Sequence, residues 1–280
     1  MRIALSFVVF MGFGLMGALS AASFPKTYVK AYKGQLVQGG LVILTLAPDT
    51  KLKLNNKNVA QINNLALIGF GRDAPLTQKI MFMRDGKTQR LNLTLKKRDY
   101  NIQRINGLPP ALVTPPPEAL PLIRQQSQQK YAARQDNIAA SWFAENFSWP
   151  VKGRITGVYG SQRFYNGQPR RPHFGVDIAA PTGTPVYAPA SGVVSLAAPD
   201  MYFEGGLVFV DHGLRLVSVL MHLNRIDVQL GDFVKAGQQI GTVGATGRAT
   251  GPHLDWRMYW ADQRVDPSLL VPSPKNGTIQ

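Results

Sequence analysis

All four histidines of the chain lie after residue 172. Two of them form short patterns with an aspartate, His173-x-x-x-Asp177 and His253-x-Asp255. Imidazole and carboxylate groups are suitable zinc ligands, and a catalytic zinc site uses three protein ligands while a fourth position stays open. Further histidines beside such a site can transfer protons. The chemistry of this chain is therefore expected in its C-terminal half.

His253 and Asp255 are expected to project from one face of a β-strand. Side chains alternate between the two faces of a strand, so residues two apart point the same way. Leu254, Trp256 and Met258 would then point to the opposite face. This spacing predicts a strand with an apolar side against the core and a His-Asp pair on its other side.

A second strand is expected over residues 216–223, where Ser218, Leu220 and His222 would share one face. A sheet that contains both strands can present His222 beside the His-Asp pair. His212 stands at a turn after a strand and is interpreted as a structural residue. Four unconnected structural histidines are the alternative to a shared site.

The N-terminus has the features of a secretory signal peptide, which we expect to span residues 1–22. Arg2 supplies a positive charge, residues 3–19 are almost all apolar, and small residues follow at 20–23. This order is typical of a segment that is cleaved during secretion, here after Ala22. An uncleaved membrane anchor is the alternative, because the apolar run approaches the length that spans a bilayer. Both interpretations predict an exported protein of the periplasm or cell envelope.

The composition indicates an anionic partner. The 280 residues include 31 Lys+Arg and 16 Asp+Glu, a net charge of +15, of which residues 23–146 carry +11 and residues 147–280 carry +3. Such a charge favours association with nucleic acid, a membrane surface or an acidic polymer, and export argues against nucleic acid. A solvated basic face is the alternative. The absence of cysteine excludes disulfides, thiolate metal sites and cysteine nucleophiles.

Residues 23–107 are expected to form a small basic β-sandwich. Short apolar or alternating runs are separated by turn residues, which is typical of such a fold. The clearest runs are 40–46, 65–70 and 89–95.

A proline-rich linker and a polar helix are expected over residues 108–146. Six prolines lie within 108–122, which indicates a stiff spacer, and a Gln-, Arg- and Ala-rich stretch follows over 122–144. Residues 147–280 change to strands punctuated by glycine. The fold class is thus mostly all-β in two domains.

The segments of this C-terminal part together resemble the lysostaphin/LytM-type zinc metallopeptidases, a family of peptidoglycan endopeptidases. The resemblance covers residues 147–272. Its ordered blocks are RITGVYGSQR (154–163), HFGVDIAAPTGTPVYAP (173–189), SGVV (191–194), VDHG (210–213), MHL (221–223), GDFVKAGQQIG (231–241) and GATGRATGPHL (244–254).

The resemblance implies an antiparallel β fold with a groove and one zinc ion. By position, His173 and Asp177 match the first two zinc ligands. His253 matches the catalytic histidine that handles the attacking water, and His222 matches a second catalytic histidine that stabilises the transition state. The implied activity is that of an exported metalloendopeptidase that hydrolyses cross-links or stem peptides of peptidoglycan. Which of these bonds is cut stays open.

The sequence departs from the family at the third ligand. The family usually has His-x-His at this point, and the second histidine is a ligand, whereas this chain has Asp255. Because aspartate also binds zinc, we expect a site made of His173, Asp177 and Asp255. Two carboxylates would neutralise the ion and weaken its pull on a carbonyl. Oxygen-rich ligation makes manganese or cobalt alternatives to zinc.

Two other functions are compatible with these motifs. One is a catalytically weak or inactive regulator that activates other wall hydrolases, although this chain keeps a metal-competent or catalytic residue at all five positions. The other is a carrier domain, because GDFVKAGQQIG also resembles the hairpin of lipoyl and biotinyl domains. Lys235 lies inside the turn rather than at an exposed tip, and export removes the modifying enzymes, which argues against a carrier.

Several residues and contacts keep more than one interpretation. Arg163, Arg257 and Tyr159 are candidates for orienting a substrate, with surface or packing roles as the alternative. The basic N-terminal module is a candidate contact for the wall polymer or for an envelope-protein partner. The oligomeric state is left open.

Overall fold

The computed structural model describes residues 24–105, 115–165 and 167–280. The expected signal peptide, residues 1–22, and part of the proline-rich linker lie outside these ranges. Within them, no helix combines the length and the apolar character needed to cross a membrane.

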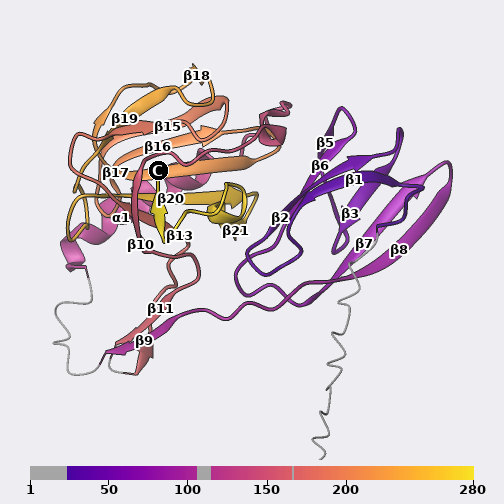
Figure 1. Cartoon of the computed structure of the whole chain (residues 1–280), viewed down its shortest axis with the longest axis horizontal. Helices are drawn as coiled ribbons and strands as arrows, with labels where there is room; N and C mark the ends of the chain where they lie inside the picture. Colours follow the sequence, from indigo (N-terminus) through magenta and orange to yellow (C-terminus); the bar gives the residue numbers. More distant parts are fainter. Residues whose placement is uncertain (1–23, 106–114, 166) are drawn as a thin grey trace, which may run out of the picture.

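The N-terminal strands build the expected β-sandwich, called here the N-terminal sandwich (Figure 1). Two four-stranded sheets enclose a hydrophobic core that includes Leu44, Ile68, Phe82 and Leu93. In chain order the strands are β1 (Val29–Gly34), β2 (Leu41–Leu46), β3 (Lys51–Leu54), β4 (Lys57–Asn58), β5 (Gln61–Ile62), β6 (Leu65–Gly69), β7 (Thr77–Arg84) and β8 (Lys87–Thr94).

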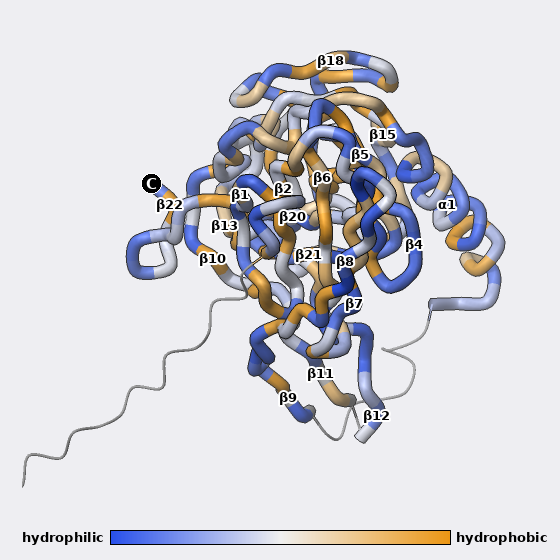
Figure 2. Tube along the Cα trace, turned by 90° about the vertical axis from the view of Figure 1, so that its right-hand side faces the viewer, coloured by the Kyte–Doolittle hydropathy of each residue, from blue (hydrophilic) through white to orange (hydrophobic). Residues whose placement is uncertain are grey.

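The sandwich follows the alternation of its sequence. One sheet has the order β1-β2-β6-β5 and the other has the order β4-β3-β7-β8. Strand β6 is buried and coloured hydrophobic in Figure 2, whereas β4 is exposed and hydrophilic. The three apolar runs expected to be strands correspond to β2, β6 and β8, so this part of the fold prediction is confirmed.

The segment that joins the N-terminal sandwich to the C-terminal strands pairs with the C-terminal part of the chain, so it is more than a spacer. Strand β9 (Ile102–Ile105) pairs in parallel with β11 (Gln162–Tyr165), and β12 (Gln168–Pro169) completes this small sheet. The 3-10 helix Pro117–Ala119 leads into α1 (Leu120–Ala132), and a second 3-10 turn covers Trp142–Ala144.

The polar helix ends about a dozen residues earlier than expected from the sequence. Residues beyond α1 bond to the C-terminal sheet instead of continuing the helix. The amide of Phe143 donates to the carbonyl of His212, and the carbonyl of Ile138 accepts from the amide of Leu214. Because Phe143 is fully buried, tertiary packing outweighs helix propensity here.

The C-terminal sheet contains eleven strands, and its described pairings are antiparallel. Its main order is β18-β15-β16-β17-β20-β13-β10-β22, with β14, β19 and β21 attached at the side. The strands are β10 (Gly153–Gly157), β13 (Gly175–Ala179), β14 (Pro185–Tyr187), β15 (Gly192–Met201), β16 (Gly205–Asp211), β17 (Leu216–Ile226), β18 (Phe233–Val234), β19 (Gln239–Val243), β20 (His253–Trp260), β21 (Gln263–Val265) and β22 (Thr278–Ile279).

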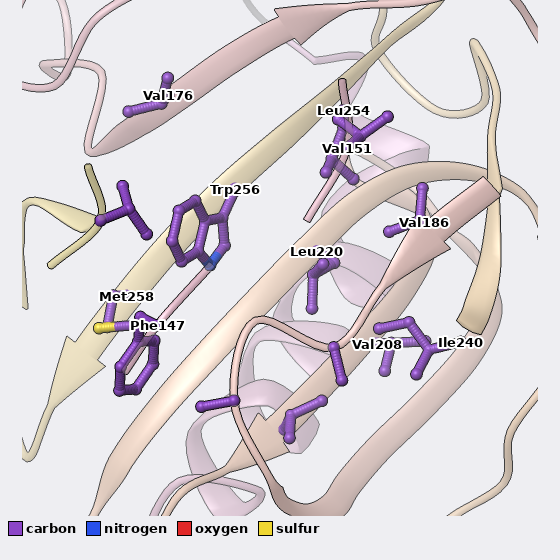
Figure 3. Close-up of a cluster of buried hydrophobic side chains, with 14 of the residues drawn as sticks. Phe147, Val151, Val176, Val186, Val208, Leu220, Ile240, Leu254, Trp256 and Met258 are labelled. Carbon is purple, nitrogen blue, oxygen red and sulfur yellow. The ribbon is translucent and has the colours of Figure 1, made fainter. Parts of the chain in front are cut away.

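The two faces of strand β20 have different roles. Leu254, Trp256 and Met258 point into the main hydrophobic core, as Figure 3 shows and as the alternation predicts. His253 and Asp255 belong to the opposite face. This arrangement confirms the expected apolar side of the strand and leaves the other side available for polar chemistry.

The N-terminal sandwich is docked against the C-terminal sheet by apolar and polar contacts. Leu41 and Leu67 of the sandwich belong to the main hydrophobic core. Arg98 forms a 2.8 Å ion pair with Asp266, which is 2% exposed. Arg72 stacks on the ring of Tyr100 and donates from Nε to the carbonyl of Gly160 at 2.8 Å. These contacts join the N-terminal and C-terminal parts closely. The domain boundaries expected at residues 107 and 146 therefore stay a prediction.

Candidate metal and catalytic centre

Three predicted ligands converge at one end of strands β13 and β20. Nε2 of His173 lies 3.1 Å from Oδ1 of Asp177 and 3.3 Å from Oδ2 of Asp255. The three ligand atoms lie within 4.8 Å of one another. Asp177 and Asp255 are direct cross-strand partners, so sheet register brings the two carboxylates together. We call these three residues the ligand cluster.

Two glycines make room for the carboxylates. A Cβ atom added at Gly157 would lie 2.2 Å from Oδ2 of Asp177. A Cβ atom added at Gly175 would lie 2.5 Å from Oδ1 of Asp255 and from Cγ of Arg257. These glycines were not predicted as site residues, although their positions in the blocks 154–163 and 173–189 were the available signal.

His173 reaches the cluster from a loop that is held by its backbone. Its amide donates to Ser161 at 2.8 Å, and its carbonyl accepts from Gly160 at 2.7 Å. Nδ1 contacts the carbonyl of Val158 at 3.3 Å, which directs Nε2 toward the carboxylates. Burial lowers the pKa of His173, but hydrogen bonds with the two aspartates outweigh it and raise the pKa to about 10.

The ligand cluster fits a small divalent cation. Around a tetrahedral zinc with bonds of about 2.0 Å, neighbouring ligand atoms are separated by about 3.3 Å, close to the two distances at His173. The raised pKa of His173 expresses the preference of two clustered carboxylates for positive charge. One imidazole nitrogen and two carboxylate oxygens provide three ligands, so the donor set suits zinc with one position left open.

His253 and His222 lie together beside the ligand cluster. Their ring centroids are 4.7 Å apart, and Nε2 of His253 is 3.9 Å from Oδ1 of Asp177. Nδ1 of His253 contacts the carbonyl of Gly251 at 2.8 Å, and Nδ1 of His222 contacts that of Thr246 at 2.9 Å. All five predicted site residues are thus brought to one place, and the Nδ1 contacts leave Nε2 of both rings available.

The prediction that His222 shares one face of strand β17 with Ser218 and Leu220 is wrong. Ser218 and Leu220 point into the main core, whereas His222 lies on the opposite face with His253. Strand β17 has a bulge here, because Leu220 pairs with Val208 while Leu223 pairs with Gly206, which leaves two residues opposite one. The φ angle of His222 is 64°, a left-handed conformation that reverses the alternation.

Burial and hydrogen bonds define the state of His222. Its amide donates to the carbonyl of Glu204 at 2.9 Å, which holds the bulge. Burial lowers the pKa of His222, and the Thr246 carbonyl opposes this shift. The ring is therefore biased toward its neutral form.

Arg257 contacts the ligand cluster directly. Nη2 lies 2.6 Å from Oδ2 of Asp255, and Nε lies 3.1 Å from both carboxylate oxygens. Burial alone would raise the pKa of Asp255, but Arg257 and His173 outweigh it and hold the pKa below its usual range. The role of Arg257 was open from the sequence, although its position two residues after Asp255 on the same strand predicts a shared face.

The other candidates for orienting substrate differ from Arg257. Tyr159 is 3% exposed, and its hydroxyl donates to the carbonyl of Arg264 at 2.8 Å. Its ring packs near Tyr100 of the N-terminal sandwich segment, so Tyr159 has a packing role. The side chain of Arg163 lies outside the described part of the structure.

His212 has the structural role expected of it. It is fully buried, with Nδ1 2.8 Å from the carbonyl of Ser191 and Nε2 2.8 Å from Oγ of Ser218. The indole of Trp256 donates to the same Ser218 hydroxyl at 3.3 Å. The carbonyl requires a proton on Nδ1, and burial lowers the pKa of His212 to about 4. The ring is therefore neutral, and Nε2 accepts a hydrogen bond from the Ser218 hydroxyl.

Comparisons with known proteins agree with this arrangement. Residues 171–267 match the model of peptidase family M23. The cell division protein DipM of Caulobacter vibrioides is 34% identical over 166 residues, which is 57% of this chain and 26% of DipM. The peptidoglycan DD-endopeptidase ShyA of Vibrio cholerae is 35% identical over 134 residues, 48% of this chain and 30% of ShyA. The chain thus spans under a third of the length of these curated relatives.

A solved structure extends the likeness beyond the C-terminal sheet. A crystal structure described as a candidate M23 peptidase of Pseudomonas aeruginosa is 30% identical, with a TM-score of 0.67. The match covers 85% of this chain and 95% of that one. The similarity therefore includes most of the N-terminal part as well as the sheet that carries the ligand cluster. Through its matched residues 171–267, the chain belongs to peptidase family M23.

Proposed function

We propose that this protein is a zinc-dependent endopeptidase that hydrolyses peptide bonds of bacterial peptidoglycan. The observation that carries the proposal is the convergence of His173, Asp177 and Asp255 beside two histidines whose Nε2 atoms are available. Membership of a peptidase family and the name of ShyA, a peptidoglycan DD-endopeptidase, support it. Manganese or cobalt are alternative ions because two of the ligands are carboxylates.

The residues around the ligand cluster have separate tasks in this proposal. Zinc, when bound, polarises the scissile carbonyl and acidifies a water molecule. His253 accepts a proton from the attacking water at Nε2, because its Nδ1–H is bonded to Gly251. His253 then gives this proton to the leaving amide nitrogen as the carbon–nitrogen bond breaks.

His222 is proposed to stabilise the negative charge on the carbonyl oxygen. With Nδ1–H bonded to Thr246, its Nε2 can donate a hydrogen bond only when the ring is protonated. The nearby carboxylate of Asp255 favours that cation, while burial opposes it. In this proposal His222 takes up one proton from solvent at Nε2 before the reaction, and the cationic ring donates this hydrogen bond to the oxygen as its negative charge develops.

The proposed setting is the periplasm or cell envelope, with peptidoglycan as the substrate. The sequence features of residues 1–22 support export, and the basic N-terminal sandwich supports contact with an acidic polymer or an envelope protein. The substrate groove expected from the resemblance stays a prediction.

Digestion of purified peptidoglycan tests the proposal. The 280-residue protein with zinc is expected to release products that mass spectrometry identifies as cleaved stem peptides or cross-links. Asp177→Asn and His253→Ala should each abolish release, and a chelator should do the same. Asp85→Asn, which changes an exposed carboxylate at a hairpin tip, is the matched control and should digest normally. Equal digestion by Asp177→Asn would contradict the proposal.

A second candidate function is a non-catalytic regulator of other wall hydrolases. The aspartate at position 255 favours it, because the third ligand position lacks the histidine that the resembling peptidases usually have there. A protein that binds no zinc and releases no product, yet accelerates digestion by an added wall hydrolase, would support the regulator over the enzyme.

A further inference from the structure

The side chain of Asp255 is bound on two sides. On one side, Oδ2 faces Nε2 of His173 at 3.3 Å. On the other side, Arg257 reaches both oxygens, with contacts of 2.6 to 3.1 Å. A carboxylate has about four lone-pair positions, so one oxygen can accept from a guanidinium and still face a cation. Asp255 is only 3% exposed, so this contact acts with little screening by water.

The formal charges of the ligand cluster and Arg257 have the same sum as those of a common type of zinc site. With zinc bound, Asp177 and Asp255 contribute two negative charges, His173 contributes none because a metal-bound imidazole nitrogen has given up its proton, and Arg257 contributes one positive charge. The sum is one negative charge. A zinc site with two histidines and one carboxylate has the same sum, without any arginine.

We propose that Arg257 is a positioning residue that pairs with Asp255 to make a neutral unit, which replaces a histidine as the third ligand. This inference rests on the proposed zinc site. Arg257 restores the positive field that a second carboxylate would otherwise remove, and it fixes the orientation of that carboxylate. Two carboxylate ligands are expected to weaken the pull of the zinc ion on a substrate carbonyl. The positive charge of Arg257 offsets this effect.

The backbone is shaped to keep this pair in place. Gly175 lies where a Cβ atom would touch both Oδ1 of Asp255 and Cγ of Arg257 at 2.5 Å. Gly175 is also the cross-strand partner of Arg257. The side chain of Arg257 keeps 27% of its surface exposed, so it lies over the sheet beside the cluster rather than in the main core.

Zinc affinity, measured against a competing chelator, tests the pair without reference to activity. Asp255→His supplies a neutral ligand but leaves Arg257 unpaired beside the ion, so zinc binding should weaken about tenfold or more relative to the unmodified protein. The double variant Asp255→His/Arg257→Gln removes that charge and should return to within about threefold of the unmodified protein. The matched control Asp255→His/Arg257→Lys keeps the positive charge and should not recover.

The outcomes separate this inference from the proposed function. Zinc binding by Asp255→His that equals or exceeds that of the unmodified protein overturns the inference, as does equal recovery by the Lys and Gln variants. Failure of the unmodified protein itself to bind zinc overturns both the inference and the proposed enzyme. Melting of each metal-free variant is recorded, and Asp255→Asn with the same Arg257 replacements gives the same expected order if Asp255→His does not fold.

Discussion

Asp177 and Asp255 face each other directly across strands β13 and β20. Like charges at such a position destabilise a sheet, and positively charged partners offset this effect. His173 provides one contact and Arg257 provides the other. The more buried carboxylate of the pair, Asp255, is also the one bound by an arginine.

The first prediction concerns metal-dependent stability. Zinc that binds the folded chain but not the unfolded chain should raise its melting temperature, and zinc at a hundred times its dissociation constant stabilises by about 2.7 kcal/mol. Asp177→Asn should lose this shift, because it removes one of three ligands. Thermal denaturation with zinc and with chelator measures it. Asp85→Asn should retain the full shift, and a full shift in Asp177→Asn would remove Asp177 from the ligand set.

The second prediction concerns the close approach at Gly157. Gly157→Ala places a methyl group 2.2 Å from the Asp177 carboxylate, so that side chain must move out of the cluster. We expect stability to fall by about 1–3 kcal/mol and zinc affinity to fall at least tenfold. Denaturant unfolding and chelator competition measure the two effects. Gly86→Asn, at an exposed turn with nothing within 4 Å, controls for glycine replacement and should change neither. Unaltered zinc binding by Gly157→Ala would speak against the close contact.

The third prediction concerns acid stability, which His212 and Asp211 affect in opposite directions. Burial lowers the pKa of His212 to about 4, so its contribution to stability is lost as pH falls from 6.5 toward 4. Burial raises the pKa of Asp211 to about 6, so stability is gained as pH falls from 6 toward 3.8. Each effect reaches about 3 kcal/mol, and the two largely offset each other in the unmodified chain.

Separate replacement of His212 and Asp211 should reveal how each residue changes the free energy of unfolding with pH. Asp211→Asn keeps an oxygen to accept from Gly213 and removes the acid-stabilising effect, so its free energy of unfolding should drop more steeply between pH 6.5 and 4. His212→Asn should instead become more stable, relative to its value at pH 7, as pH falls from 6 to 4. Urea unfolding across this range measures both, and parallel pH profiles for the two variants would contradict the opposing shifts.

The fourth prediction concerns the contact between the N-terminal sandwich and the ligand loop. Arg72 donates to the carbonyl of Gly160, and the amide of Gly160 donates to the carbonyl of His173. Arg72→Met keeps the bulk of the side chain but removes the donor, so the loop loses a buried hydrogen bond worth about 1–3 kcal/mol. We expect lower stability and weaker zinc binding together. Arg84→Met, at a partly exposed arginine that ends strand β7 and donates to the carbonyl of Thr27, should leave zinc affinity unchanged. An unchanged zinc affinity in Arg72→Met would separate the sandwich from the site.

Local patterns predicted much of the site. The period of two placed Leu254, Trp256 and Met258 in the core, and the His-x-Asp spacing placed His253 and Asp255 on the other face. The same rule failed at His222, because a bulge with a left-handed residue reverses the alternation and nothing in the local sequence marks that residue as left-handed. Strand periodicity is thus a reliable guide only where the ladder is regular.

Contacts between distant segments were harder to predict. The shared face of Asp255 and Arg257 follows from their spacing, but the salt bridge depends on the room left by Gly175 from another strand. The shortened helix and the pairing of β9 with β11 depend on tertiary contacts across tens of residues. Sequence periodicity carries no information on such pairings, which arise only when the segments meet.

Strand β9 has a consequence for any shortened form of the protein. A chain that begins at residue 147 lacks β9. Strand β11 then pairs only with β12, and its other edge is left without a partner. It also loses Arg72, and with it a bond to the loop of His173. A fragment that begins at residue 147 is therefore expected to hold His173 less firmly than the intact chain does. Removal of the residues before 147 by proteolysis would then lower zinc affinity without changing any residue of the ligand cluster.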